Sequence, residues 1–136
     1  MAVRYLLDTN ICIYIAKRRP PEVLHHFEQL TVGEVAMSII TYGELQFGAE
    51  KSQNSQAAHD KLARLAEIVP VLALPDKAAL HYGRVRVRLE KSGTPIGAND
   101  LWIAAHALAE DFILVSNNAS EFSRVPGLQW ENWVTQ

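Results

Sequence analysis

The sequence predicts an α/β fold in which a central, mainly parallel sheet of four to five strands has helices on both faces. Two observations predict it. Short apolar runs alternate along the chain with longer segments in which apolar residues recur at helical spacing. The apolar runs are nearly uninterrupted by polar residues, as in strands buried on both faces of a parallel sheet. No repeat, low-complexity tract or linker divides the chain, so we expect a single domain over residues 1–136.

The first half of the chain is expected to supply three strands and four helices. Val3–Leu7 is a short apolar run suited to a central strand. The Arg18–Pro21 stretch breaks the helical pattern, because proline disrupts a helix interior. The other expected elements are helices at Asn10–Lys17, Pro21–Leu30, Thr41–Lys51 and Gln56–Glu67, and strands at Glu34–Ser38 and Ile68–Leu72.

The second half begins with a helix from Pro75-Asp76 to Lys91, although "RVRVR" at residues 84–88 alternates like a strand. The length of the segment and its flanking caps favour helix. Gly93 stands where a left-handed cap falls, and Pro95 prevents continuation. The remaining expected elements are a helix at Gly97–Glu110, a strand at Phe112–Ser116, at most a helical turn at Ser120–Phe122, and an edge strand at Leu128–Trp130.

Composition narrows the classes of protein. Hydrophobic residues make up 49% of the chain and charged residues 21%, as in ordinary globular domains. The formal net charge of −2 argues against a general nucleic-acid coat protein but allows a local basic strip. Cys12 is the single cysteine and cannot form a disulfide within the chain, and neither a membrane-spanning run nor a signal peptide is evident. We therefore expect a cytoplasmic protein with no membrane contact.

Carboxylates and amides follow the predicted strands in four separate segments. Ligand sites of open parallel sheets lie beyond the carboxyl ends of the strands, so we expect these side chains at one edge of the sheet. They are Asp8 directly after the first strand, Glu44 in the helix after the second, Asp100 in the first turn of the helix from Gly97, and Asn117, Asn118 and Glu121 after the strand ending at Ser116.

Helix capping is the simpler explanation for most of these residues. Thr41 and Glu44 have the spacing of a capping box, as do Asn118 and Glu121. Asp100 in a first helical turn complements the helix dipole. Capping explains an acid at the end of the first strand less well, because Asn10 could cap the helix that follows. Capping also does not predict that so many of these positions follow apolar strands.

Clustered carboxylates repel one another and raise the pKa of at least one member unless a cation offsets them. Hard oxygen ligands of this kind suit Mg²⁺, with Mn²⁺ as the alternative, and the cluster contains no cysteine or histidine of the kind that favours zinc. Such an ion lowers the pKa of water and stabilises charge on a phosphoryl oxygen. The pattern therefore indicates metal-assisted hydrolysis of a phosphodiester.

Four segments carry a family resemblance: "YLLDTNICIYIAK", "ITYGELQFGAEKS", "GTPIGANDLWIAAHALAED" and "ILVSNNASEFSRVPGLQWENW". In this order they resemble the VapC toxins of bacterial toxin–antitoxin pairs, which are PIN-domain ribonucleases, and especially the group that cuts initiator tRNA in its anticodon region. The resemblance implies a PIN domain and a magnesium-dependent endoribonuclease whose products carry a 5′-phosphate and a 3′-hydroxyl. It also implies inhibition by a VapB-type antitoxin, a homodimer, and a higher-order complex with the antitoxin.

The resemblance also implies roles for particular residues. The family's three acids fall on Asp8, Glu44 and Asp100, which gives the hypothesis that the first and third hold Mg²⁺ while Glu44 is a further ligand or positions the attacking water. Thr9 and Asn10 are expected to orient the first acid. Family members often have a fourth acid after the last core strand, and here Asn117, Asn118 and Glu121 share that neighbourhood, so this position stays open.

Basic residues concentrate at two places, and a solvated helix face and a track for RNA phosphates are both open interpretations of each. On a helix Arg84, Arg88 and Lys91 share one side, while Arg86 points elsewhere. The second group is Lys17 and Arg18, followed by Arg19. The apolar segments Ile11–Ile15 and Tyr42–Phe47 are further expected to form a dimer face or to receive the antitoxin.

Other functions compete with nuclease activity. An aspartate phosphatase of the haloacid dehalogenase type needs a second acid two residues after the first, where this chain has Asn10. A receiver domain needs paired acids and a late lysine that "LVSNNAS" does not supply. The uncertain fourth position leaves open a PIN-fold module that binds RNA or regulates with weak or no cleavage. The five histidines lack metal-ligand spacing and are expected to be structural or surface residues; His106 points away from Asp100.

Overall fold

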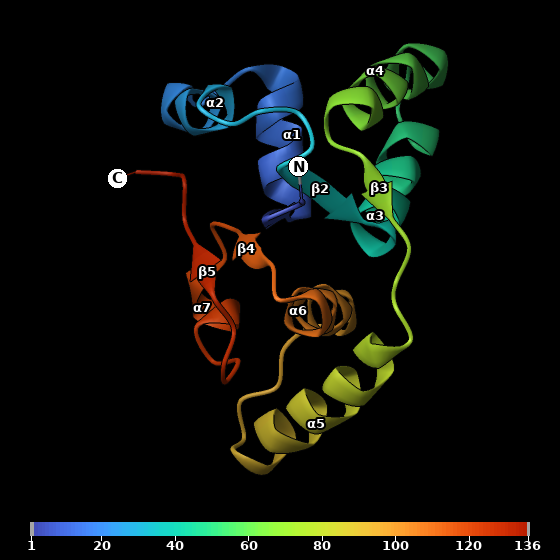
Figure 1. Cartoon of the computed structure of the whole chain (residues 1–136). Coiled ribbons are helices and arrows are strands. Elements are labelled where there is room, and N and C mark those ends of the chain that lie inside the picture. Colours follow the sequence, from blue (N-terminus) through green and yellow to red (C-terminus); the bar gives the residue numbers. More distant parts are fainter. Residues whose placement is uncertain (1, 136) are drawn as a thin grey trace.

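The computed structural model describes residues 2–135 and contains a five-stranded sheet with the order β3-β2-β1-β4-β5 (Figure 1). All neighbouring strands are parallel, so the predicted sheet is confirmed, at the upper end of the expected strand number. β1 occupies the centre, where Leu6 pairs with Ala36 on one side and Leu114 on the other. The strands are β1 Tyr5–Leu7, β2 Val35–Ser38, β3 Val71–Leu72, β4 Ile113–Val115 and β5 Trp130–Glu131.

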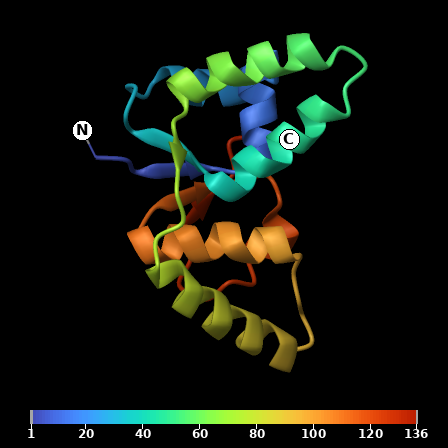
Figure 2. The ribbon, with the colours of Figure 1, turned by 90° about the vertical axis from the view of Figure 1, so that its right-hand side faces the viewer.

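Helices cover both faces of this sheet. In Figure 1, α1, α2 and α4 lie above the sheet and α6 and α5 lie below it, while α7 sits beside β5. Figure 2 shows α5 running along α6 on the side away from the sheet. The helices are α1 Thr9–Lys17, α2 Pro21–Glu28, α3 Ile39–Glu50, α4 Ser55–Ile68, α5 Lys77–Lys91, α6 Ala98–Glu110 and α7 Ala119–Phe122.

The core has two halves separated by the sheet. Consecutive side chains of a strand point to opposite faces, so Leu7 packs with α1, α2 and α4 while Leu6 packs with α5 and α6. In the same way Val115 belongs to the first half and Leu114 to the second. Both faces of the central strands are therefore apolar, which is why their sequence shows no polar alternation.

All five strands differ from their predicted bounds at one or both ends. β2 begins one residue later, at Val35, and β4 is one residue shorter at each end, at Ile113–Val115. β1 begins at Tyr5, not Val3. The expected strand from Ile68 is shortened to Val71–Leu72, because α4 continues to Ile68 and Pro70 then prevents a further helical turn. The edge strand lies one to two residues later than expected, at Trp130–Glu131, where it pairs with Leu114 and Val115.

The residues that cap the helices differ from the predicted capping residues. Asp8 itself caps α1, accepting a hydrogen bond from the Ile11 N–H at 3.1 Å, so the argument that capping explains Asp8 less well because Asn10 could cap this helix does not hold. Ser38 caps α3, and the Thr41 hydroxyl is buried without a hydrogen-bond partner among residues 2–135. At α7 the Asn118 side chain makes no capping bond. Neither expected capping box is formed.

The ambiguous "RVRVR" segment lies within α5, as predicted. Val85 and Leu89 are buried with the α6 side chains, whereas the arginines between them are exposed. Gly93 has a φ of +70°, which fits the left-handed turn expected after this helix. Over the described residues, the structure contains no helix with both the length and the hydropathy needed to cross a bilayer.

Candidate active site

Four acids, each from a different segment of the chain, lie around the carboxyl edge of β1 and β4. Asp8 follows β1, Glu44 lies in α3, Asp100 lies in the first turn of α6, and Glu121 lies in α7. The negative charge of Glu44 raises the pKa of Asp8, and the charges of Glu121, Asp8 and Glu44 all raise the pKa of Asp100. The predicted acids are thus close enough to interact electrostatically, although they are distant in sequence.

Asp8 is almost completely buried, with 6% of its surface exposed. Burial raises its pKa to about 6, because a charged carboxylate loses its hydration; hydrogen bonds from the Ser116 side chain and the Ile11 N–H partly offset this. Asn10 contributes a smaller effect through its backbone, and its side chain is exposed. Sequence reasoning missed Ser116, whose signal was a polar residue at the end of the apolar run "ILVS".

Glu44 is held by Thr9, whose hydroxyl donates a hydrogen bond to Oε1 at 2.5 Å. This bond joins the first residue of α1 to α3. Thr9 therefore lies beside Asp8 in sequence, as expected, but the acid it contacts is Glu44. Glu44 is available to the site because it is not engaged in the predicted capping box.

Asp100 shares hydrogen bonds with the segment after β4. Asn118 Nδ2 donates to Glu121 Oε2 at 3.0 Å and, more weakly, to Asp100 Oδ2 at 3.4 Å, while Glu121 Oε1 accepts from the Gly97 N–H at 3.3 Å. Burial, a hydrogen bond with Glu121 and then the neighbouring charges raise the pKa of Asp100 to about 8. The same hydrogen bond lowers the pKa of Glu121. Of the two carboxyl groups, Asp100 therefore takes up a proton more readily than Glu121.

The three residues considered for the fourth position are placed differently. Asn118 and Glu121 both contact the Asp100 carboxyl group or its hydrogen-bond partners. Asn117 instead donates from Nδ2 to the Tyr14 hydroxyl at 3.1 Å. The structure therefore brings two of the three residues to Asp100, and the role of either as a ligand stays a prediction.

Arg124 is near enough to Glu121 for its positive charge to lower the pKa of that carboxyl group, but no ion pair involves the acid cluster among the described residues. In the part of the chain that the structure describes, the ion pairs are Arg4–Glu34, His59–Glu50 and Arg86–Glu90, none of which involves the cluster. Over residues 2–135, no three His, Cys, Asp or Glu side chains stand close enough together to hold an ion as they are placed. Side chains would have to turn inward, or water would have to complete the ligand set. Clustered carboxylates outside any ion pair, with an amide and a hydroxyl nearby, are nevertheless a donor set that fits Mg²⁺ or Mn²⁺.

A groove of about 660 Å³ extends from Thr9 and Glu44 between α1, α3 and α4. Its walls include Leu45, Leu62 and Leu65. It also contains three lysines, Lys17, Lys51 and Lys61. Of the predicted basic pair at the end of α1, therefore, Lys17 lines the groove, whereas Arg18 is the exposed C-terminal cap of α1 and does not.

The expected apolar docking segments are only partly at the surface. In Ile11–Ile15, the side chains of Ile11, Cys12 and Ile15 are in the core, so this segment cannot present a continuous apolar face and the expectation is wrong for them. In Tyr42–Phe47, by contrast, the Phe47 ring is 66% exposed.

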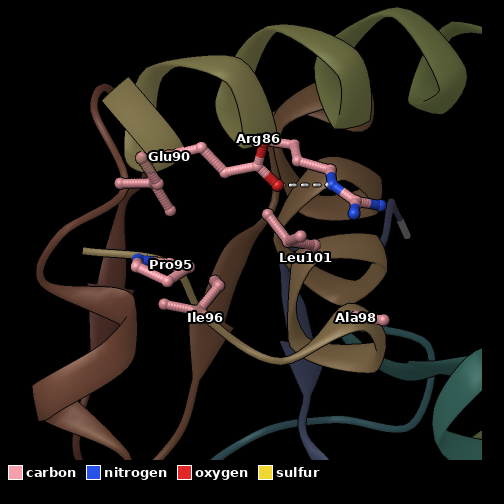
Figure 3. A pocket seen from close by; sticks show the side chains of 7 residues that line it. Arg86, Glu90, Pro95, Ile96, Ala98 and Leu101 are labelled. Carbon is pink, nitrogen blue, oxygen red and sulfur yellow. Dashed lines mark hydrogen bonds and ion pairs between the residues drawn. The ribbon is translucent and has the colours of Figure 1, made fainter. Parts of the chain in front are cut away.

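A smaller hollow of about 180 Å³ lies between the end of α5 and the start of α6 (Figure 3). On its rim Arg86 Nε donates to Glu90 at 2.9 Å, and the guanidinium also donates to the Tyr82 hydroxyl. None of the clustered acids lines this hollow. The residues of the predicted basic row remain exposed, and none is in an ion pair among the described residues; these are Arg84, Arg88 and Lys91.

Comparison with known proteins identifies relatives over almost the whole chain. The PIN domain profile matches residues 5–128. Ribonuclease VapC2 of Haemophilus influenzae is 48% identical over 136 residues, covering 97% of this chain and 99% of the relative. The tRNA(fMet)-specific endonuclease VapC of Shigella flexneri is 39% identical over 131 residues, covering 96% and 98%. A chain in the structure of VapBC-1 from nontypeable Haemophilus influenzae superposes with a TM-score of 0.90 at 43% identity, covering 98% of this chain and 100% of the other.

Proposed function

This chain belongs to the PIN-domain family and, within it, to the VapC ribonucleases, and from that premise we propose that it is a magnesium-dependent endoribonuclease that cuts initiator tRNA in the anticodon region. Mn²⁺ is the alternative ion. Relatives that carry the name tRNA(fMet)-specific endonuclease support this substrate. The observation that carries the metal requirement is the cluster of interacting acids, none of which is in an ion pair among the described residues.

The residues of the chain have distinct parts in this mechanism. Asp8 and Asp100 would hold the ion, with Glu44 as a further ligand or as the residue that positions the attacking water. When bound, the ion lowers the pKa of water and stabilises negative charge on the phosphoryl oxygens. Thr9 restricts the Glu44 carboxylate through its hydrogen bond, and Asn118 restricts Asp100. Because Asp8 lies at a strand end and caps a helix, its carboxylate is fixed before any substrate arrives.

The partner in this proposal is a VapB-type antitoxin that keeps the toxin inactive. Solved complexes of related toxins with antitoxins support such a partner. The groove between α1, α3 and α4 is the surface we assign to an apolar antitoxin segment, since it reaches Thr9 and Glu44 and has leucine walls. The proposal includes a homodimer that assembles further with the antitoxin, and a cytoplasmic location where tRNA is available.

RNA recognition is proposed to use the exposed row Arg84, Arg88 and Lys91 on α5 and, near the groove, Lys17 and Arg18. Unpaired basic side chains bind phosphates without reading sequence, so these residues would supply affinity and orientation. Base selection would then depend on the shape of the anticodon loop.

Cleavage of purified initiator tRNA tests the proposal, with elongator methionine tRNA as the matched substrate control. We expect a cut in the anticodon region with Mg²⁺, and a loss of about 100-fold or more both in EDTA and in Asp100→Asn. Equal cleavage in EDTA would show that the reaction does not require a divalent metal ion. Binding of initiator tRNA with no cleavage by the wild-type protein would favour the alternative of a PIN-fold RNA-binding or regulatory module.

A further inference from the structure

A buried hydrogen bond connects the two helices that carry Glu44 and Asp100. His106 Nδ1 lies 3.0 Å from the Ser38 hydroxyl, 68 positions away in sequence. His106 is 1% exposed and Ser38 is completely buried. Ser38 ends β2 and caps α3, which carries Glu44, while His106 lies in α6 less than two turns after Asp100. α3 and α6 contact each other, and in Figure 2 the start of α3 (teal) lies next to α6 (orange).

The hydrogen-bond capacity of Ser38 indicates the direction of this bond. Its oxygen accepts from the Ile40 N–H at 3.2 Å, which leaves one hydroxyl proton to donate. Among the described residues, His106 Nδ1 is the only partner found for that proton. A neutral ring protonated at Nε2 accepts this proton at Nδ1, which satisfies both groups, and burial lowers the pKa of His106 in the direction that favours a neutral ring. Phe112 packs at 6.1 Å from the ring centre and restricts its movement.

We propose that His106 is a positioning residue, which fixes α3 against α6 through Ser38 and so sets the separation of Glu44 and Asp100. The inference rests on the proposed function and deepens it. A hydrophobic contact tolerates sliding, but a buried polar pair does not, because either group left without its partner loses a hydrogen bond that water cannot replace. The bond thus selects one register between the two helices, and with it one spacing of the acids.

Two substitutions at position 106 separate positioning from simple packing. His106→Leu keeps a similar volume but offers no acceptor, so the Ser38 hydroxyl is left unpaired. His106→Asn leaves a small cavity but carries its carbonyl oxygen on Cγ, the atom to which Nδ1 is attached in histidine. A packing role predicts that the leucine variant retains function better. A positioning role predicts that the asparagine variant does.

The measurements are calorimetric titration of the metal-free full-length chain with Mn²⁺, and kcat and KM for initiator tRNA. For His106→Leu we expect Mn²⁺ binding and kcat to fall about 10-fold or more with KM nearly unchanged, since small misplacements of reacting groups are costly. For His106→Asn we expect both to stay within about 3-fold of wild type, even where urea unfolding shows lower stability. The double variant Ser38→Ala, His106→Leu should be no worse in Mn²⁺ binding than His106→Leu alone.

Wild-type Mn²⁺ affinity and kcat in a folded His106→Leu protein would overturn the proposal, as would equal defects in the leucine and asparagine variants. If His106→Leu does not fold, Ser38→Ala is measured in its place, with the same expected losses. Failure of the proposed function is distinguishable, because the wild-type protein would then neither bind Mn²⁺ nor cut tRNA.

Discussion

Replacing Asp8 by asparagine should abolish RNA cleavage and yet make the metal-free protein more stable at neutral pH. Asp8 is buried, and its pKa is raised to about 6, so the folded chain at pH 7.5 retains a charged carboxylate that would be more stable in water. Asparagine keeps an oxygen that can accept the hydrogen bond from the Ile11 N–H at the start of α1. The substitution removes the charge and preserves the cap.

The magnitude follows from the proton linkage. With a pKa of 3.8 in the unfolded chain and about 6 in the folded chain, ionised Asp8 costs about 3 kcal/mol of stability at pH 7.5. The cost is absent below the unfolded pKa, grows as the pH rises towards the folded pKa, and is full above it. At pH 4.5 the same relation gives a destabilisation by Asp8 of about 1 kcal/mol. In the asparagine variant the NH₂ group is imperfectly hydrogen-bonded, which lowers the stability of the variant by about 1 kcal/mol at every pH.

The assay is urea unfolding in EDTA at pH 7.5 and pH 4.5. We expect Asp8→Asn to be more stable than wild type by about 2 kcal/mol at pH 7.5. At pH 4.5 this difference in stability should be smaller by about 2 kcal/mol, so that the two proteins are nearly equally stable. Asn54→Asp is the matched control, because Asn54 caps α4 through the Ala57 N–H at an exposed position. That exchange should change stability little. A variant less stable than wild type at pH 7.5, or an advantage independent of pH, would refute the linkage.

Three further outcomes are expected. Asp100→Asn should reduce cleavage about 100-fold or more while the protein remains folded, as measured by RNA cleavage beside circular dichroism. The pKa values of Asp8 and Asp100 are raised to about 6 and about 8, so protons compete with the ion for these carboxylates. Calorimetry should therefore show that the affinity for Mn²⁺ falls as the pH drops from 8 to 6. A constant affinity over this range would contradict the competition. The double variant Arg84→Gln, Arg88→Gln should reduce the slope of log affinity against log salt concentration for tRNA binding by about 1.5. Arg86→Gln is the control and should change this slope less, because Arg86 is already paired with Glu90. Equal effects would place the RNA track elsewhere.

The fold and the positions of the acids could be predicted from sequence because the signals are local. Apolar runs without alternation indicate strands buried on both faces, and the rule for parallel sheets places their polar ends together. The α5 helix was predictable despite "RVRVR" because the flanking caps and the length of the segment outweigh five residues that alternate like a strand. In the structure the buried Val85 and Leu89 are four residues apart, about one helical turn. Strand ends were less predictable: Ile68 is as apolar as a strand residue, but α4 continues through it until Pro70.

The hydrogen-bond partners of the site could not be predicted, because they depend on three-dimensional packing. Thr41 and Glu44 have capping-box spacing, yet α3 begins two residues before Thr41, which leaves Glu44 free to accept from Thr9. Ser116 lies beside Asp8 only because β4 pairs with β1. Sequence spacing carries no information about either contact.

Asp8 shows why capping and catalysis need not be competing explanations. The helix start requires an acceptor on residue 8, and Oδ1 supplies it to the Ile11 N–H. Asparagine or serine could serve equally well for that purpose, and without the stability lost by burying a charge next to Glu44. An aspartate at this position therefore makes the metal-free protein less stable than necessary. The cap fixes one carboxylate oxygen and leaves the negative charge at the strand end, where a divalent cation would recover the lost stability on binding. Capping accounts for the orientation of the side chain, and only the proposed ion accounts for its charge.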